Sequence, residues 1–483
     1  MPTPTSPPLV VDLDGTLLLT DSLQELALAQ CKNSLWQALR IPAWLQQGKA
    51  QLKQALAERN PLDAASLPYH QELLQWLRAE QAQGRTLVLC TGADQRVAQA
   101  VAEHLGLFSA VIASDGQHNL TAARKAQALV QRYGAQGFDY VGNSRDDLPV
   151  WQQARQAIVA NAAPAVQQAA QQQGNVARSF PAPARDARSL LRALRPHQWL
   201  KNLLLFVPLL AAQQFGNGGA WGLLLLAFLS FSLCASAVYI GNDLLDLQSD
   251  RQHPRKCQRP FASGRIPVAW GVALAPLLLA ASLGLGLLVG PAFLAWLAVY
   301  FALTCWYSLS LKRLVLLDCL TLAGLYTLRI VAGAAAVGLV LSHWLFGVSG
   351  FMFLSLSFLK RYTELHMLAQ RGSGQASAHG RGYLAQDAPL VQALGVGAGY
   401  AAAVLLALYL DSNTARTMYR LPEAIFLAIA VLVYWISWLW LQAHRGQMHD
   451  DPVFFAIKDR TSLLCGLAFA ATLALGMLGL PWA

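Results

Sequence analysis

Long apolar runs in the second part of the chain restrict its fold more than any other feature. Such runs recur with short polar stretches between them, at about 202–215, 220–241, 267–288, 290–309, 314–338, 342–359, 388–410, 422–442 and 461–481. A helix of roughly 20 apolar residues is long enough to cross a bilayer. The sequence therefore predicts an all-α bundle of nine transmembrane helices over residues 201–483, in an integral inner or plasma membrane protein.

Composition agrees with a membrane protein and argues against other classes. Of the 483 residues, 55% are hydrophobic and 13% are charged, whereas residues 1–188 are polar and rich in Gln and Ala. We assign the net charge of +10 to cytoplasmic loops that attract anionic lipid or phosphate. No basic groove with interleaved aromatic residues is evident, so we expect no nucleic acid partner. The seven cysteines lack a CxxC pair, which argues against a disulfide framework or a zinc site.

Basic residues are distributed unevenly over the predicted loops. The loops after the second, fourth, sixth and eighth runs hold most of the Lys and Arg residues, whereas the opposite loops hold only Arg416 and Arg420. By the positive-inside rule, this places the N-terminus in the cytoplasm and the C-terminus outside. The first residues, MPTPTSPPLVVDLDGT, also lack the features of a signal peptide. We therefore expect a cytoplasmic N-terminal domain.

The second apolar run ends in acidic residues followed by bases, YIGNDLLDLQSDRQHPRKCQRPFASG over 239–264. Asn242, Asp246 and Asp250 recur every fourth residue with Asp243 beside them, so a helix would present them on one face. Carboxylates at the mouth of a membrane helix need a cation, and Mg²⁺ bound to a diphosphate suits oxygen ligands. The bases that follow have donors for phosphate oxygens. A solvated loop that obeys the positive-inside rule is the alternative.

This stretch resembles the first aspartate-rich motif, approximately NDxxDxxxD, of the UbiA superfamily of intramembrane prenyltransferases. The resemblance runs from about Arg188 to the C-terminus and implies nine helices. Typical members carry a second aspartate-rich motif, whereas this chain has Asp318 but Leu322 where the partner acid is expected. The segments RPHQWLKN, LKRYTEL, GRGY and HDDPVFFAIKDR look like one branch, the decaprenyl-phosphate 5-phosphoribosyltransferases. In that branch a lipid phosphate attacks C1 of phosphoribosyl pyrophosphate (PRPP), and pyrophosphate leaves.

The resemblance implies roles for particular residues. Asp243 and Asp246 are expected to be catalytic, and together with Asn242 and Asp250 they would hold Mg²⁺ on the pyrophosphate and help it depart. Candidate substrate- and phosphate-binding residues are Lys201, Asn202, Arg251, Lys256, Arg259, Tyr307, Lys312, Asp318, Arg329, Lys360, Arg361 and Arg381. Of these, Lys256, Arg259 and Lys312 would neutralise the leaving group.

Simpler interpretations of these residues remain open. Asp318 and Arg329 lie three turns apart on one predicted helix, so one face would present both, and intramembrane charges are functional by default. A structural salt bridge between helices is the alternative for them. Ordinary loop charge is the alternative for the bases.

Two further function classes remain open for the membrane part. One is a conventional prenyltransferase, which moves a prenyl group from its diphosphate to an aromatic or other small acceptor. The other is a non-catalytic lipid-phosphate sensor or transporter. The expected partners are accordingly the membrane, a polyprenyl phosphate lipid, and either PRPP or a prenyl diphosphate. A homo-oligomer is a further candidate assembly.

The N-terminal part alternates short apolar runs with helical, Gln- and Ala-rich pieces. The runs are Leu9–Val11, Thr86–Cys90, Ala110–Ala113 and Phe138–Val141, and small or acidic polar residues follow each one. This alternation predicts βαβ units in an α/β doubly wound sheet. The polar residues would then lie at the carboxyl ends of the strands, where sites form. With DLDGT at 12–16, this part resembles the haloacid dehalogenase (HAD) superfamily.

The HAD resemblance implies a Mg²⁺-dependent phosphohydrolase. Asp12 would attack phosphorus to form an aspartyl phosphate, and Asp14 would protonate the leaving oxygen and then activate water. Thr91 and Lys125 would hold the phosphoryl oxygens. Mg²⁺ would bind Asp12, the Asp14 carbonyl and Asp147. The last motif, GNSRDD from 142 to 147, has Asn where the family has its first acid, so a degenerate domain kept for binding or regulation is the alternative.

Domains are predicted at 9–178 for the HAD-like part, with a helical cap at about 20–83, at 179–200 for a linker and an interfacial amphipathic helix, and at 201–483 for the membrane transferase. Linker-like composition, rich in Ala, Gln and Pro, begins already at Asn161 and extends to Asp186. The fusion suggests one pathway, in which the HAD domain removes the 5-phosphate of a phosphoribosyl lipid. Tethering would hold the two parts at an effective concentration on the order of millimolar.

Overall fold

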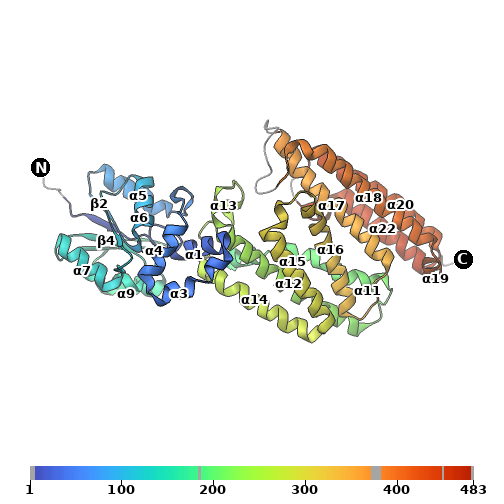
Figure 1. Cartoon of the computed structure of the whole chain (residues 1–483), viewed down its shortest axis with the longest axis horizontal. Helices are drawn as coiled ribbons and strands as arrows, with labels where there is room; N and C mark the ends of the chain where they lie inside the picture. Colours follow the sequence, from blue (N-terminus) through green and yellow to red (C-terminus); the bar gives the residue numbers. More distant parts are fainter. Residues whose placement is uncertain (1–5, 183–186, 371–381, 449–450, 480–483) are drawn as a thin grey trace. The chain divides into compact units, whose positions relative to one another are not determined.

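The computed structural model describes residues 6–182, 187–370, 382–448 and 451–479. The chain forms two compact units (Figure 1). The first consists of Met1–Pro196 together with Tyr239–Leu277, and the second of His197–Val238 together with Leu278–Ala483. The aspartate-rich stretch at 239–264 therefore belongs to the same unit as the α/β domain.

A six-stranded parallel sheet in the order β3-β2-β1-β4-β5-β6 forms the centre of the first unit, which confirms the doubly wound α/β prediction. Its strands are β1 (Leu9–Val11), β2 (Leu87–Asp94), β3 (Ala110–Ser114), β4 (Asp139–Gly142), β5 (Gln156–Ala160) and β6 (Val176–Phe180). The irregular linker expected from residue 161 is wrong for 164–180, which form a helix and the edge strand β6. Only Phe180 of β6 is buried, so this strand has no apolar run to reveal it.

Helices cover both faces of the sheet. They are α5 (Gln71–Ala82), α6 (Gln95–Leu105), α7 (Ala122–Tyr133), α8 (Leu148–Gln153) and α9 (Pro164–Gln172). Leu9 and Val11 of β1 pack in one core with α5 and α6. Val10, which points to the opposite face, packs in a second core with α7, α8 and α9. Both faces are buried, and this explains the continuous apolar run of β1.

The predicted cap is a set of short helices between β1 and α5. They are α1 (Ser22–Asn33), α2 (Leu35–Ala38), α3 (Ile41–Gln46), α4 (Lys49–Arg59) and η1 (Ala64–Ser66). Helix α5 lies inside the predicted cap range of 20–83, but its Leu73 and Leu77 are buried in the core on the sheet. The inserted helices therefore end before α5.

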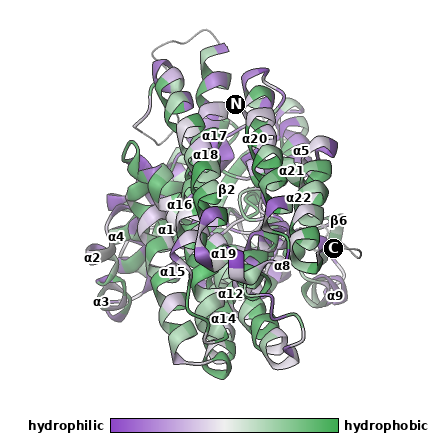
Figure 2. Ribbon diagram, turned by 90° about the vertical axis from the view of Figure 1, so that its right-hand side faces the viewer, coloured by the Kyte–Doolittle hydropathy of each residue, from purple (hydrophilic) through white to green (hydrophobic). Residues whose placement is uncertain are grey.

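The remaining chain is helical. Its elements are α10 (Ala187–Leu194), η3 (Pro196–Phe206), α11 (Val207–Ala211), α12 (Gly218–Leu245), α13 (Leu247–Gln252), η4 (Lys256–Gln258), α14 (Val268–Val289), α15 (Pro291–Leu309), η5 (Leu311–Arg313), α16 (Leu317–Ala336), α17 (His343–Gln370), η6 (Ala385–Asp387), α18 (Ala388–Asp411), α19 (Asn413–Met418), α20 (Pro422–His444), α21 (Pro452–Lys458) and α22 (Arg460–Leu478). Figure 2 shows the long helices coloured mainly as hydrophobic.

Within the described residues, seven helices are long and apolar enough to cross a membrane, rather than the nine predicted. The first predicted span, at about 202–215, is divided between the short elements η3 and α11. The sixth, at about 342–359, lies in α17, which has 28 residues but is not one of the seven. Its second half carries Lys360, Arg361 and Glu364. These charges lower its hydropathy.

In the second unit, α17, α18, α20 and α22 pack against one another, as Figure 1 also shows. Close approach depends on small residues, as is common between membrane helices. A Cβ atom on Gly395 of α18 would overlap the Trp440 ring of α20. Likewise, a Cβ on Gly333 of α16 would overlap the main chain of Leu205 in η3. These glycines set the spacing of the helices that carry the polar groups described below.

Candidate active sites

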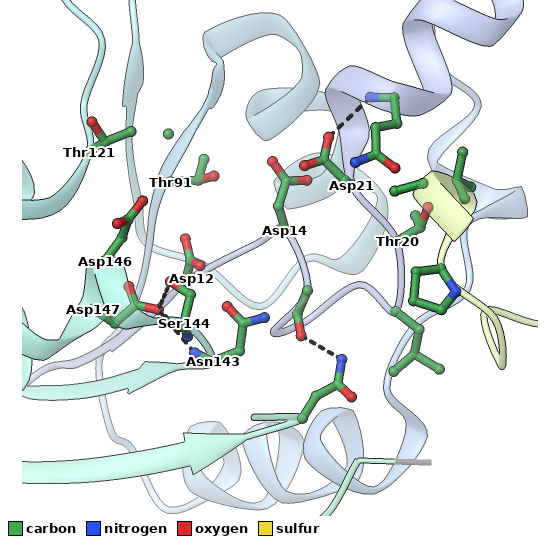
Figure 3. Close-up of a pocket in the computed structure, with 18 of the residues that line it drawn as sticks. Asp12, Asp14, Thr20, Asp21, Thr91, Thr121, Asn143, Ser144, Asp146 and Asp147 are labelled. Carbon is green, nitrogen blue, oxygen red and sulfur yellow. Dashed lines mark hydrogen bonds between the residues drawn. The ribbon is translucent and has the colours of Figure 1, made fainter. Parts of the chain in front are cut away.

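The DLDGT loop lies at the carboxyl end of β1, and its first aspartate is held by a lysine from α7. Asp12 is buried at 6% exposure, and Lys125 donates to its Oδ1 at 2.8 Å. Figure 3 shows Asp12 and Asp14 near Thr91, which lies within β2. Thr91 is buried, and its hydroxyl accepts a hydrogen bond from the amide of Ala93. The structure thus brings together all four residues predicted for the phosphoryl group.

Asp14 is oriented by the first turn of the cap. The amide and the hydroxyl of Ser22 donate to its two carboxylate oxygens at 2.8 and 3.0 Å. Burial, followed by the nearby charge of Asp21, raises the pKa of Asp14 to about 7. Burial also raises the pKa of Asp12 to about 6, although Lys125 opposes the shift. Near neutral pH, one carboxyl is thus suited to be an anionic nucleophile and the other a proton donor.

A hydrogen-bond network fixes the lysine and the last acid of the site. Lys125 donates to the Tyr140 hydroxyl at 2.9 Å, and that hydroxyl donates to Asp147 Oδ1 at 2.8 Å. The other oxygen of Asp147 accepts from both the amide and the hydroxyl of Ser144 and from the amide of Asn143, each at 3.0 Å. Asp147 therefore anchors this loop, and its predicted role as a metal ligand stays a prediction.

Asn143, at the position where the haloacid dehalogenase resemblance implies an acid, lies against the DLDGT loop. Gly15 has a φ of +72°, which favours glycine. A Cβ atom at this position would overlap the side-chain amide of Asn143. The loop is therefore shaped by this contact, and Asn143 lies near Asp12 and Asp14, as Figure 3 shows.

A cavity of about 410 Å³ opens over these groups. The cap contributes Thr20, Asp21, Gln24 and Lys53 to its wall. The Lys53 ammonium donates to the Gly92 carbonyl and to Asn119 Oδ1, the latter at 2.9 Å. Burial lowers the pKa of Lys53, although the charges of Asp14 and Asp21 oppose this. Sequence reasoning missed Lys53 because a single lysine in a cap helix belongs to no motif.

The donor groups of this cavity suit Mg²⁺. Two buried carboxyls, Asp12 and Asp14, have raised pKa values because burial disfavours their charge. A divalent cation beside Asp12 would favour the ionised form of that carboxyl. No group of three His, Cys, Asp or Glu side chains is arranged to bind a metal in the part of the chain that the structure describes. The candidate ligands beside Asp12 are therefore Asp147, the Asp14 carbonyl, Asn143, water and the substrate.

The aspartate-rich stretch keeps the predicted helical spacing. Helix α12 ends at Leu245 and α13 begins at Leu247, with Asp246 between them. The amide of Asp246 donates to the carbonyl of Asn242 at 2.9 Å, and that of Asp250 to the carbonyl of Asp246 at 2.8 Å. The spacing of four residues therefore survives the change of helix.

The acids of this stretch are paired with bases. Asp243 is buried and accepts from Arg195 at 2.6 Å and from Arg259 at 3.0 Å. Arg259 also donates to Asp250 at 2.5 Å. Burial raises the pKa of Asp250, although Arg259 opposes the shift. Arg259, predicted to neutralise a leaving group, thus links two acids, and Arg195 is a partner that sequence reasoning missed.

The other predicted residues of this stretch occupy varied places. Lys32 of the cap donates to Asp246 at 3.0 Å. Arg251 pairs with Glu25 of α1. Lys256 is exposed and Lys312 is half-buried. Arg381 lies outside the described residues.

In the second unit, two predicted lysines converge on one acid. Lys201 and Lys360 lie 2.9 and 3.3 Å from Asp451 Oδ2. Burial alone would raise the pKa of Asp451, but the charges of Lys360 and Lys201 hold it below its ordinary value. The Lys201 ammonium also lies 5.5 Å from the centre of the Tyr326 ring. Two of the predicted phosphate-binding residues of the unit thus lie beside one acid.

Asp318 and Arg329 do not pair with each other. Asp318 of α16 accepts from Arg361 of α17 at 2.5 Å, and both side chains are fully buried. Arg361 also pairs with Glu364. The interhelical salt bridge named above as the alternative for Asp318 is thus present, with a partner that sequence spacing did not indicate.

Arg329 lies in a separate polar cluster. Its guanidinium donates to Asn202 Oδ1 at 2.9 Å and to the Tyr300 hydroxyl at 3.2 Å. Tyr307 is half-buried near the end of α15. The predicted set is therefore spread over several clusters. None of these placements tests substrate binding, which stays a prediction.

Comparison with known proteins gives two family matches. The UbiA prenyltransferase family matches residues 203–458, and a haloacid dehalogenase-like hydrolase model matches residues 9–152. The uncharacterized protein y4nM of Sinorhizobium fredii is 37% identical over 97% of this chain and 91% of its own length. A decaprenyl-phosphate phosphoribosyltransferase of Mycobacterium tuberculosis is 30% identical over 60% of this chain and 94% of its own. A solved UbiA homolog from Archaeoglobus fulgidus, bound to GPP and Mg²⁺, covers 60% of this chain and 98% of its own at 17% identity, with a TM-score of 0.43.

Proposed function

Because the chain belongs to the UbiA prenyltransferase family and also carries a HAD-like hydrolase domain, we propose that it makes a ribosylated lipid in two steps. Its membrane part transfers 5-phosphoribose from PRPP to a polyprenyl phosphate. Its α/β domain then removes the 5-phosphate. The 30% identity to a decaprenyl-phosphate phosphoribosyltransferase supports the first step.

One observation favours PRPP over a prenyl diphosphate as the donor. Where a second aspartate-rich motif is expected, Leu322 replaces an acid, and Asp318 is already bound to a buried Arg361. The second unit instead offers Lys201 and Lys360 on a single acid, Asp451. Cations of this kind suit a substrate pair with more phosphate groups than a prenyl diphosphate and an aromatic acceptor.

In the transfer step, a phosphate oxygen of the lipid forms a bond to C1 of PRPP while the bond from C1 to pyrophosphate breaks. Asn242, Asp243, Asp246 and Asp250 offer oxygen donors that suit Mg²⁺, which when bound would neutralise the departing pyrophosphate. Arg259, which now links Asp243 and Asp250, would exchange these carboxylates for diphosphate oxygens. Asp243 and Asp250, no longer paired with Arg259, would then be able to bind the metal.

In the hydrolysis step, an oxygen of Asp12 attacks phosphorus, and the bond to the ribose 5-oxygen breaks. Asp14 gives its proton to that oxygen and later takes a proton from water. The resulting hydroxide attacks the aspartyl phosphate, which releases inorganic phosphate and restores Asp12. Lys125, already bonded to Asp12, and Thr91 would hold the phosphoryl oxygens throughout. Asn143, Asp147 and the Asp14 carbonyl are the candidates to complete a Mg²⁺ site with Asp12.

A single assay on the purified full-length protein tests both steps. With PRPP labelled in the ribose and polyprenyl phosphate in nanodiscs, we expect a labelled lipid without a 5-phosphate, together with pyrophosphate and inorganic phosphate. Asp12→Asn should stop the reaction at the phosphorylated lipid, and the double change of Asp243 and Asp246 to Asn should stop it before any lipid is labelled. Absence of labelled lipid with the unchanged protein would refute the transfer.

Membership of a prenyltransferase family favours one alternative, a conventional prenyl transfer from a prenyl diphosphate to a small acceptor. The same preparation distinguishes the two. Label that enters product from a prenyl diphosphate, and not from PRPP, would support the alternative.

A further inference from the structure

The hydrolase cavity is not built by the α/β domain alone. Part of its wall comes from the segment that follows the aspartate-rich motif, through Gly264, Arg265, Pro267, Val268 and Ala269. Figure 3 shows this segment as the yellow-green ribbon beside Thr20. It belongs to the same compact unit as the catalytic loop. A segment assigned by sequence to the transferase therefore helps to shape the hydrolase.

A buried ion pair holds this segment to the cap. Both terminal nitrogens of Arg251 donate to Glu25, at 2.6 and 3.1 Å, and the two side chains are only 5% and 3% exposed. Glu25 also accepts from the hydroxyl of Thr20 at 2.7 Å. The third donor of Arg251, its Nε, bonds the carbonyl of Ala262 at 2.9 Å. One guanidinium thus joins the cavity wall at Thr20 to the start of the segment.

Close packing continues this contact to the cavity. Gly264 has a φ of +72°, and a Cβ there would lie 2.7 Å from the Cβ of Leu19, the residue before Thr20. Phe261 and Ala262 are buried. Arg265, which follows Gly264, lines the cavity and is exposed. The chain around Arg265 is therefore held in place while its guanidinium is open to a ligand.

The cavity has more room and more cations than a phosphomonoester needs. Its volume of about 410 Å³ is that of a pocket for a whole small molecule, well above the size of one phosphoryl group. Lys125 is bonded to Asp12, so it serves the reacting phosphate. Arg265 is a further cation with no part in the hydrolysis steps described above. Val268 and Ala269, also in the wall, begin the candidate span α14.

We propose that Arg265 binds a second phosphate of the hydrolase substrate, the phosphodiester that joins the sugar to its lipid. The substrate class is then a sugar with a phosphomonoester at one end and a lipid-linked phosphodiester at the other. This inference rests on the proposed hydrolysis step and adds the group that selects the lipid-linked substrate over free sugar phosphates. The start of α14 in the wall gives an apolar surface for the first part of the lipid.

Two soluble probes test the inference with the full-length protein. One is ribose 5-phosphate, and the other is its 1-(methyl phosphate), a diester without the lipid chain. The measurement is inorganic phosphate released from each, as kcat and KM. With the unchanged protein we expect the lower KM for the diester. Arg265→Ala should raise the KM of the diester about tenfold, since one charge-assisted contact is lost. Arg265→Ala should leave the kcat for the diester unchanged. It should also leave kcat and KM for ribose 5-phosphate unchanged.

Controls separate this role from a structural one. Arg265→Lys should recover part of the lost affinity for the diester. Arg255→Ala removes an exposed arginine of the same stretch that does not line the cavity, and it should change neither KM. An equal effect of Arg265→Ala on both probes, or none on either, would overturn the role of Arg265 and leave the hydrolase standing. No phosphate from either probe would overturn this inference and the proposed hydrolysis together.

Discussion

At the scale of single residues, the hydrolase site depends on two carboxyls with different surroundings. Asp12 faces a lysine, whereas Asp14 faces the amide and hydroxyl of Ser22 and lies near Asp21. Burial raises both pKa values, and more so for Asp14. Because nucleophile and acid need opposite protonation states, this difference in environment supports the proposed roles of Asp12 as nucleophile and Asp14 as acid.

The pH dependence of phosphate release should follow these two groups. Asp12 must be ionised to attack, so kcat/KM should fall as pH drops below the pKa of Asp12, which is about 6 without a cation and lower once a cation binds. Asp14 must carry a proton, so the rate should also fall, about tenfold per pH unit, above about 7. Phosphate release from ribose 5-phosphate across pH 5 to 9 measures the profile. A rate that keeps rising to pH 9 would show that Asp14 is not the acid.

The Tyr140 hydroxyl should stabilise the α/β domain because it bonds two charged groups, Lys125 and Asp147. Tyr140→Phe removes a buried hydroxyl that accepts from Lys125 and donates to Asp147. We expect a loss of about 1–3 kcal/mol in unfolding free energy of the α/β domain, because both groups lose a buried partner. Phosphate release should fall as well. Tyr133→Phe in α7 is the matched control, and equal melting temperatures for both variants would contradict the role of Tyr140.

At the scale of elements, charged pairs join helices that are distant in sequence. Arg361 of α17 reaches Asp318 of α16, and Lys201 of η3 reaches Asp451 at the start of α21. Two such pairs connect the cap to the aspartate-rich stretch, namely Lys32 with Asp246 and Arg251 with Glu25. The effect of each pair on folding stability depends on its burial. An exposed pair contributes little to the free energy of unfolding, whereas breaking a buried pair lowers that free energy strongly.

Asp318→Asn should destabilise the membrane part strongly. The change removes the only fully buried acid that pairs with Arg361 in the described part of the chain, because its other partner, Glu364, is 33% exposed. Breaking a buried pair costs about 3–5 kcal/mol. Asp411→Asn breaks the exposed pair with Arg416, whose side chains are 73% and 62% exposed, and should cost less than about 1 kcal/mol. Thermal unfolding in detergent compares them, and similar shifts for the two variants would refute a structural role for Asp318.

At the scale of the whole molecule, we propose the same cation, Mg²⁺, for two sites with different chemistry. The hydrolase cavity has buried carboxyls that a cation would stabilise. The aspartate-rich stretch has acids now held by Arg195, Arg259 and Lys32. Since the first compact unit contains both, a change in the stretch can affect the cavity wall through the segment that carries Arg265.

Removal of divalent metal should therefore stop both reactions. With EDTA in excess, we expect neither labelled lipid from PRPP nor inorganic phosphate from ribose 5-phosphate, because the phosphate groups of both substrates would lack the divalent cation that neutralises their charge. Added Mg²⁺ in excess of EDTA should restore both activities. If either activity continued at its normal rate in EDTA, the metal-based mechanism of that site would be wrong.

The local features of this protein could be predicted from its sequence. The DLDGT loop was placed at a strand end by the apolar run before it, and the spacing of Asn242, Asp246 and Asp250 persists in the structure. Apolar runs identified the membrane part, because hydrophobicity and helix length are properties of contiguous residues. Strand β6 was missed, since an edge strand with one buried residue has no periodic signal.

Tertiary structure alone decided which charges meet. Arg259 lies between Asp243 and Asp250, Arg361 pairs with Asp318 rather than standing open to substrate, and Arg265 borders a cavity that sequence assigned to another domain. Periodicity states which face of a helix a residue occupies. Which residue of the facing element pairs with it depends on packing between segments far apart in the chain. A local sequence pattern therefore does not predict that partner.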